Sequence, residues 1–78
     1  MSNLEKYNNT FCETLQIGEE QLSGLEYQGT PLWDSVGHMT LMAALEDAFD
    51  IMMDTDDIVD FSSYEKGKEI LKKYDVEI

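Results

Sequence analysis

A chain of 78 residues with a formal net charge of −12 has room for one domain with a modest core. Its 17 acidic residues against 5 basic ones exclude a nucleic-acid-binding surface and oppose contact with anionic membranes. The N-terminus lacks the features of a signal peptide, no apolar run approaches the roughly 20 residues of a membrane-spanning helix, and Cys12 is the single cysteine. These features predict a monomeric cytoplasmic protein without membrane insertion.

The acidic residues are distributed unevenly. Between Lys6 and Lys66 there is no lysine or arginine, and that interval holds thirteen carboxylates. The negative electrostatic potential of these carboxylates attracts basic protein surfaces and accelerates their association, and the association rate falls as the salt concentration rises. We therefore expect basic partner proteins; the alternative is that the charge only keeps a small protein soluble.

Residues 2–16 are predicted to form the first helix, which Gly18 ends. Ser2 and Glu5 make a capping box, and apolar residues recur at helical spacing at Leu4, Tyr7, Phe11 and Leu15. Residues 18–33 contain three glycines and one proline and show no strict period, so they predict a long connection. We expect this loop to be packed, with its apolar anchors at Leu22, Leu25, Tyr27 and Leu32.

A second helix is predicted from Asp34 or Ser35 to about Asp50, with Asp34 as a favoured N-cap residue. Residues 54–60 have room for one or two turns. A last helix starts at Ser62 or Ser63, with a capping box of Ser62 and Glu65. No segment alternates apolar and polar residues over enough positions to form a sheet, so residues 1–78 are predicted to form one all-α domain. It is a small four-helix bundle, three main helices plus one short helix, with a long loop between helices 1 and 2.

The second helix has two apolar faces. The face expected in the core carries Leu41, Met42, Leu45, Ala48 and Phe49, with His38 among them. The opposite face carries Val36, Met39 and Ala43, followed by Glu46 and Asp47. An exposed apolar strip bordered by carboxylates is typical of a partner site, although residues 18–33 could instead cover it.

A catalytic serine is disfavoured at Ser35. His38 lies three residues further along the helix and points about 60° away from it, with no third residue to orient the pair. Trp33 and Gly37 flank the serine where a nucleophile elbow requires two glycines. We therefore predict no catalytic residue, and we expect His38 at the edge of the core with a hydrogen bond to the loop.

Four carboxylates have the spacing of a calcium-binding loop, at Asp54, Asp56, Asp60 and Glu65. Ile58 occupies a position that needs an oxygen ligand, and Val59 occupies the position of the turn glycine. We therefore predict no metal site. Weak divalent-cation binding that relieves carboxylate repulsion is left as a hypothesis.

The segment Asp34-Ser35-Val36, followed by Leu45-Glu46-Asp47-Ala48-Phe49, resembles the signature of the acyl carrier protein family. The resemblance covers essentially the whole chain in length, acidity and helix order. It implies that Ser35 receives 4′-phosphopantetheine from coenzyme A, whose terminal thiol carries acyl groups as thioesters in fatty acid, polyketide or related specialised biosynthesis. It also implies that Asp34 is a recognition and capping residue and that the docking face consists of Val36, Met39, Ala43, Glu46 and Asp47.

The partners implied by this resemblance are a phosphopantetheinyl transferase, which supplies the catalytic base, an acyl-activating ligase, and condensing or acyl-transfer enzymes with basic docking surfaces. The chain itself would not be an enzyme. Gly37 and Thr40 stand where fatty acid synthesis members usually have acidic residues, which favours a specialised pathway. Gly37 also lowers helix propensity by roughly 1 kcal/mol relative to alanine, so we expect a looser first turn.

Two alternatives to an acyl carrier remain open at this point. The first is an aminoacyl or peptidyl carrier with the same arm and a different cargo. The second is an acidic protein-interaction module without a prosthetic group.

Overall fold

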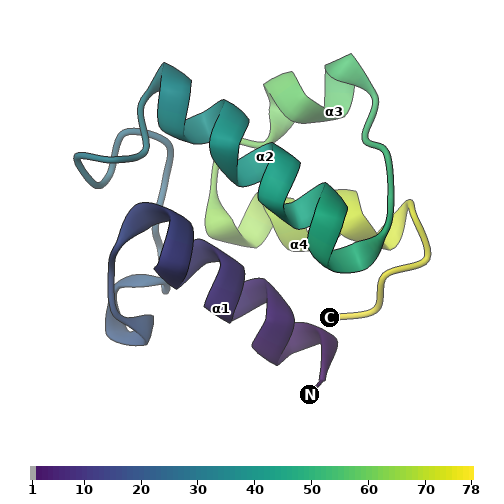
Figure 1. Ribbon diagram of the computed structural model, residues 1–78, viewed down its shortest axis with the longest axis horizontal. Coiled ribbons are helices and arrows are strands. Elements are labelled where there is room, and N and C mark those ends of the chain that lie inside the picture. The colour runs from purple at the N-terminus through teal and green to yellow at the C-terminus, as the bar shows by residue number, and fades with distance from the viewer. Residues whose placement is uncertain (1) are drawn as a thin grey trace.

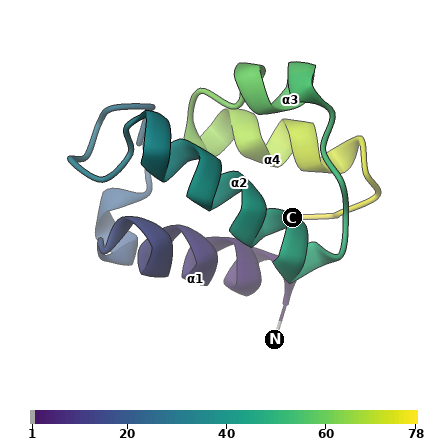
Figure 2. The same ribbon diagram turned by 45° about the horizontal axis from the view of Figure 1, so that its top comes forward.

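The computed structural model describes residues 2–78, which form the predicted all-helical bundle. Its elements are α1 (Asn3–Leu15), the 3-10 turn η1 (Glu19–Gln21), α2 (Ser35–Phe49), the short α3 (Thr55–Asp60) and α4 (Tyr64–Lys72). Figure 1 and Figure 2 show α1 and α2 side by side in opposite directions, and α2 lies between α1 and α3 in both views. Within residues 2–78, no helix is both long and apolar enough to cross a bilayer.

An aromatic cluster around Phe11 joins the main helices. The Phe11 ring lies 4.9 Å from Tyr7, 5.5 Å from Trp33 and 5.4 Å from Tyr64, measured between ring centroids. Aliphatic side chains surround these rings, and the buried ones include Leu15, Leu22, Leu25, Leu41, Met42, Leu45, Ile70 and Leu71. The expected core face of α2 is therefore confirmed at its centre, whereas His38, Ala48 and Phe49 are half-buried. Of the four apolar residues at helical spacing in α1, Tyr7, Phe11 and Leu15 are buried, whereas Leu4 in the first turn is 41% exposed.

The first helix begins as predicted and ends earlier than predicted. The Ser2 hydroxyl accepts a hydrogen bond from the Glu5 backbone N–H at 3.2 Å. The helix ends at Leu15, and Gln16 takes the left-handed conformation with φ 56°. The Ile17 N–H then bonds back to the Cys12 carbonyl at 3.1 Å, and the Ile17 side chain packs against the core. The prediction that Gly18 ends the helix is therefore wrong, because packing of Ile17 requires the chain to reverse at Gln16.

The last helix is capped by Ser63, whose hydroxyl accepts from the Lys66 N–H at 3.0 Å. The Ser62 carbonyl accepts instead from the Tyr27 N–H at 2.8 Å, and the Tyr64 N–H donates to the Leu25 carbonyl at 2.9 Å. The predicted capping box of Ser62 and Glu65 is therefore wrong. Pairing between the α1–α2 loop and the segment before α4 places Ser62 outside the helix.

Polar contacts attach the short helix α3 to α4. The Asp57 side chain, on a residue only 5% exposed, accepts a hydrogen bond from Lys73 Nζ at 2.5 Å and another from the Tyr74 hydroxyl. The Tyr74 hydroxyl also accepts from the Asp54 N–H at 2.9 Å. The hydrogen bond from Lys73 is the main cause that lowers the pKa of Asp57, with the one from Tyr74 second. The ionised form of Asp57 is therefore the form that holds α3.

We predict that this contact makes the fold sensitive to acid. Since the pKa of Asp57 is lower in the folded chain than in the unfolded one, its contribution is complete above the unfolded pKa near 4 and is lost as pH falls through the folded value. Urea unfolding at a series of pH values should show a steeper loss of unfolding free energy below about pH 4 in the wild type than in Asp57→Asn. The control Asp56→Asn, which removes an exposed carboxylate of the same helix, should keep the wild-type slope, and equal slopes in all three proteins would contradict the assignment.

Candidate functional site

Ser35 is exposed at the first position of α2, as the sequence predicted for the attachment residue. Trp33, two residues earlier, is fully buried. Between them, Asp34 is the N-cap residue, and its carboxylate accepts from the Gly37 N–H at 2.8 Å. Because Asp34 caps the helix, the Ser35 hydroxyl is not needed as a capping group. It lies at the surface, 3.3 Å from the Tyr27 hydroxyl.

Gly37 allows the chain to pass closely over the start of α2. A Cβ atom at this position would lie 1.7 Å from the carbonyl oxygen of Leu32. No side chain larger than hydrogen fits there without moving the backbone. From the sequence we expected Gly37 only to loosen the first turn of α2. Its packing role was not predicted: because it has no side chain, residues 32–34 can lie against the turn that begins at Ser35.

His38 connects α2 to Trp33 and to α3. The indole nitrogen of Trp33 donates to His38 Nδ1 at 3.0 Å, and His38 Nε2 lies 2.8 Å from the carbonyl oxygen of Ile58. An indole nitrogen can only donate, so Nδ1 is the acceptor, and Nε2 carries the proton that is donated to Ile58. The expected hydrogen bond between His38 and the loop is present, and the loop residue that donates it is Trp33. Because both ring nitrogens already have partners within the fold, neither is free to take a proton from Ser35.

A groove of about 270 Å³ lies between α2 and α3 beside this site. It is lined by Tyr27, His38, Met39, Ile58, Val59, Phe61 and Ser62. The lining is mainly apolar, and Tyr27 belongs both to the groove and to the surroundings of Ser35. An apolar groove with a few polar groups is the usual form of a small-ligand site. The sequence pattern did not predict Tyr27, Ile58, Val59 or Phe61 as site residues, because they come together only through the packing of α3 against α2.

The outward face of α2 is open to solvent. Val36 is 76% exposed and Met39 is 57% exposed, while Ala43 and Asp47 are also exposed. The alternative that residues 18–33 cover this face is therefore wrong. Glu46 differs from the rest of the expected docking face, because it is half-buried and its carboxylate accepts from the Met53 N–H at 2.8 Å.

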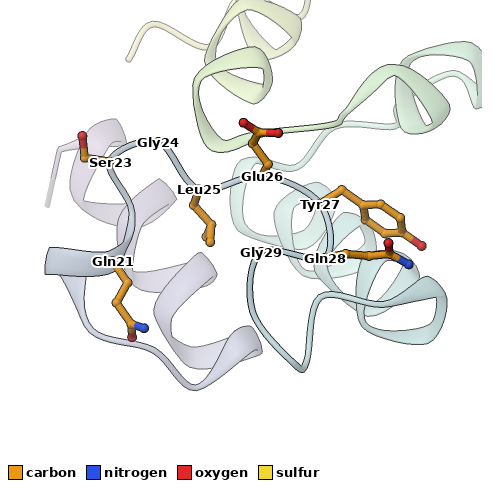
Figure 3. A pocket seen from close by; sticks show the side chains of 8 residues that line it. All are labelled: Gln21, Ser23, Gly24, Leu25, Glu26, Tyr27, Gln28 and Gly29. Carbon is orange, nitrogen blue, oxygen red and sulfur yellow. The ribbon is translucent and has the colours of Figure 1, made fainter.

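The α1–α2 loop is packed at two of its four expected anchors. Leu22 and Leu25 are buried, whereas Tyr27 and Leu32 are exposed. Gln21 and residues 23–29 line a hollow of about 510 Å³, and Figure 3 shows that the side chains of Tyr27 and Gln28 extend together from one side of the loop. Its lining is mixed, because it includes the polar residues Gln21, Ser23, Glu26 and Gln28 together with Leu25 and Tyr27, whereas the lining of the groove between α2 and α3 is mainly apolar.

The carboxylates with calcium-loop spacing do not form a loop. Asp56 and Asp60 lie on the helix α3, and Glu65 lies in the first turn of α4. Among residues 2–78, no three acidic, histidine or cysteine side chains are grouped so that they could hold a metal ion.

Because Gly37 is closely packed, we predict that its replacement by alanine destabilises the protein, which is the opposite of the usual effect of this substitution in a helix. At an ordinary exposed helix position, replacing glycine by alanine stabilises a protein by about 1 kcal/mol. At Gly37 the added methyl group meets the Leu32 carbonyl, so we expect Gly37→Ala to lower the free energy of unfolding by about 1–3 kcal/mol. Chemical denaturation measures this change, with Val36→Ala at an exposed neighbouring position as the control. A Gly37→Ala protein as stable as the wild type would contradict the close packing of residues 32–37.

Comparison with known proteins identifies no relative of this chain. The chain matches no protein-family model, and neither a curated protein nor a solved structure matches it.

Proposed function

We propose that this chain is an acyl carrier protein in which Ser35 bears a 4′-phosphopantetheine arm. The observation that carries the proposal is an exposed serine hydroxyl at the start of α2, released from capping by Asp34 and adjacent to an apolar groove. The resemblance of residues 34–36 and 45–49 to the carrier signature supports the same reading. The arm would supply a terminal thiol that binds acyl groups as thioesters.

The surroundings of Ser35 suit the phosphodiester of such an arm. Within α2 the first turn contains no acidic side chain, although the carboxylate of the N-cap residue Asp34 precedes it and occupies the Gly37 N–H. A negative group at a helix N-terminus is stabilised by free N–H groups and the helix dipole, typically by about 0.3–1 kcal/mol. This effect opposes the repulsion expected from the acidic chain as a whole. The primary hydroxyl of Ser35 can also enter the active site of another enzyme without any movement of the core, because its side chain is at the surface.

Attachment of the arm needs no catalytic group from this chain. The Ser35 oxygen would attack the phosphorus next to the pantetheine portion of coenzyme A and form a new P–O bond. The P–O bond to the adenosine 3′,5′-bisphosphate portion breaks, and that portion leaves with the electron pair. The hydroxyl proton passes to a base of the transferase, because both ring nitrogens of His38 are engaged elsewhere.

The groove suggests the size and character of the cargo. Its volume of about 270 Å³ lies just below the range of about 300–1,000 Å³ found for drug-sized ligands. Its walls include the rings of Tyr27 and Phe61 and the side chains of Ile58 and Val59. A short, largely apolar acyl group fits these properties, and the same reasoning favours an acyl over a highly polar aminoacyl cargo.

The partners in this proposal are a phosphopantetheinyl transferase, an acyl-activating ligase and condensing or acyl-transfer enzymes in the cytoplasm. Val36 and Met39 offer exposed apolar contacts beside Ser35, and Val59 on α3 extends this surface across the groove. The surrounding carboxylates, which include Asp47, would attract basic partner surfaces. An apolar centre with a charged rim is the usual arrangement of a transient docking surface.

We predict that the purified chain gains the mass of one arm when it is incubated with coenzyme A and a broad-specificity phosphopantetheinyl transferase. Ser35→Ala should show no gain, because it lacks the accepting oxygen. Ser62→Ala, which removes a different hydroxyl at the groove, should still be modified fully. Intact-mass spectrometry measures all three proteins. An unmodified wild type, under conditions that modify a control carrier, would favour the acidic interaction module.

The docking surface can be tested separately from the attachment residue. We predict that Val36→Ser combined with Met39→Ser lowers kcat/KM for the transferase about tenfold, which corresponds to about 1.4 kcal/mol of transition-state binding. Met52→Ser is a matched control, because Met52 is 87% exposed but follows the far end of α2. The control should react at the wild-type rate. Equal losses in both proteins would indicate a general effect of removing surface methionine and would contradict a docking role for the first turns of α2.

A further inference from the structure

Tyr27 connects the Ser35 hydroxyl to the groove between α2 and α3. Its hydroxyl oxygen lies 3.3 Å from Ser35 Oγ, and its side chain forms part of the groove lining. From this double position we infer that Tyr27 is a positioning residue, which bonds to the arm on Ser35 and directs it into the groove. This inference rests on the proposed function and adds a residue that the sequence pattern gave only as a loop anchor.

The backbone holds Tyr27 firmly opposite Ser35. Its N–H donates to the Ser62 carbonyl at 2.8 Å, and the next residue, Gln28, donates to the Trp33 carbonyl at 3.0 Å. The first bond ties Tyr27 to Ser62, another residue of the groove lining, and the second ties the loop to Trp33, which precedes α2. Tyr27 is therefore tied to both sides of the site even though it belongs to a long loop.

The ring of Tyr27 is also fixed by aromatic neighbours. It packs edge-to-face against His38 at 5.5 Å and against Trp33 at 6.2 Å, measured between ring centroids. Edge-to-face pairs at such distances are favourable, and here both neighbours belong to the hydrogen-bonded set that joins α2 to α3. The ring therefore stands as a wall of the groove next to the attachment point.

Attachment of the arm would change the role of the Tyr27 hydroxyl. In the unmodified chain, either hydroxyl can donate to the other, since serine and tyrosine both donate and accept. Once the Ser35 oxygen is a phosphate ester it has no proton, so Tyr27 becomes the donor. The neighbouring phosphate oxygens are negatively charged acceptors, and hydrogen bonds to charged acceptors are stronger than neutral ones. The Tyr27 hydroxyl would thus hold the start of the arm while its ring covers the section that enters the groove.

Two variants separate the hydroxyl from the ring. Tyr27→Phe removes only the hydroxyl, and Tyr27→Ala removes the ring as well. Ser23→Ala, which deletes an exposed hydroxyl in the same loop, is the control. Each protein is loaded with the arm, checked by intact mass and circular dichroism, and studied by phosphorus NMR. After loading of a short acyl group, the rate of thioester cleavage by hydroxylamine reports how well the groove shelters the cargo.

We expect the phosphorus chemical shift of Tyr27→Phe to differ from that of the wild type and of Ser23→Ala. We expect thioester cleavage in Tyr27→Ala to be about threefold to tenfold faster than in the wild type, in line with the loss of a well-placed aromatic contact. A Tyr27→Phe shift identical to the wild type, or a Tyr27→Ala thioester cleaved at the wild-type rate, would overturn the inference and leave the carrier function intact. A wild type that takes up no arm would overturn the proposed function and this inference together.

Discussion

The buried indole of Trp33 determines the orientation of the residues that follow it. Its ring packs against Phe11 in the core, and its N–H bonds to His38 on α2. With Trp33 directed inward, Asp34 reaches the Gly37 N–H and caps the helix, and Ser35 is left at the surface. The burial of one side chain, Trp33, thereby leaves the hydroxyl of Ser35 exposed at the start of α2.

The groove depends on polar contacts that hold α3. His38 donates to the Ile58 carbonyl from α2, and Asp57 accepts hydrogen bonds from Lys73 and from Tyr74, beyond the end of α4. Because α3 has only six residues, it cannot be stable on its own and needs such contacts. These contacts are made by two adjacent residues in the middle of α3, Asp57 and Ile58, and they hold the helix beside α2, where it forms one wall of the groove.

Much of the fold was predictable from the sequence, because helical periodicity and capping residues are local signals. The four helices, the capping by Asp34 and the exposure of Val36 and Met39 follow from such signals. The left-handed Gln16 and the choice of Ser63 over Ser62 as the cap were not predictable, since each depends on a distant contact: Ile17 packs against the core, and Ser62 bonds to Tyr27. The groove and the place of Tyr27 beside Ser35 arise in the same way, from the packing of the α1–α2 loop and α3 around α2.

Mass mapping of the protein purified from its native cells shows whether Ser35 carries the arm in the cell. Cleavage after glutamate releases residues 27–46, a peptide in which Ser35 is the single serine. We expect this peptide to be heavier by one phosphopantetheine arm, and we expect fragmentation to place the added mass on Ser35. A peptide of unmodified mass in every preparation, or an arm located on another residue, would contradict this expectation.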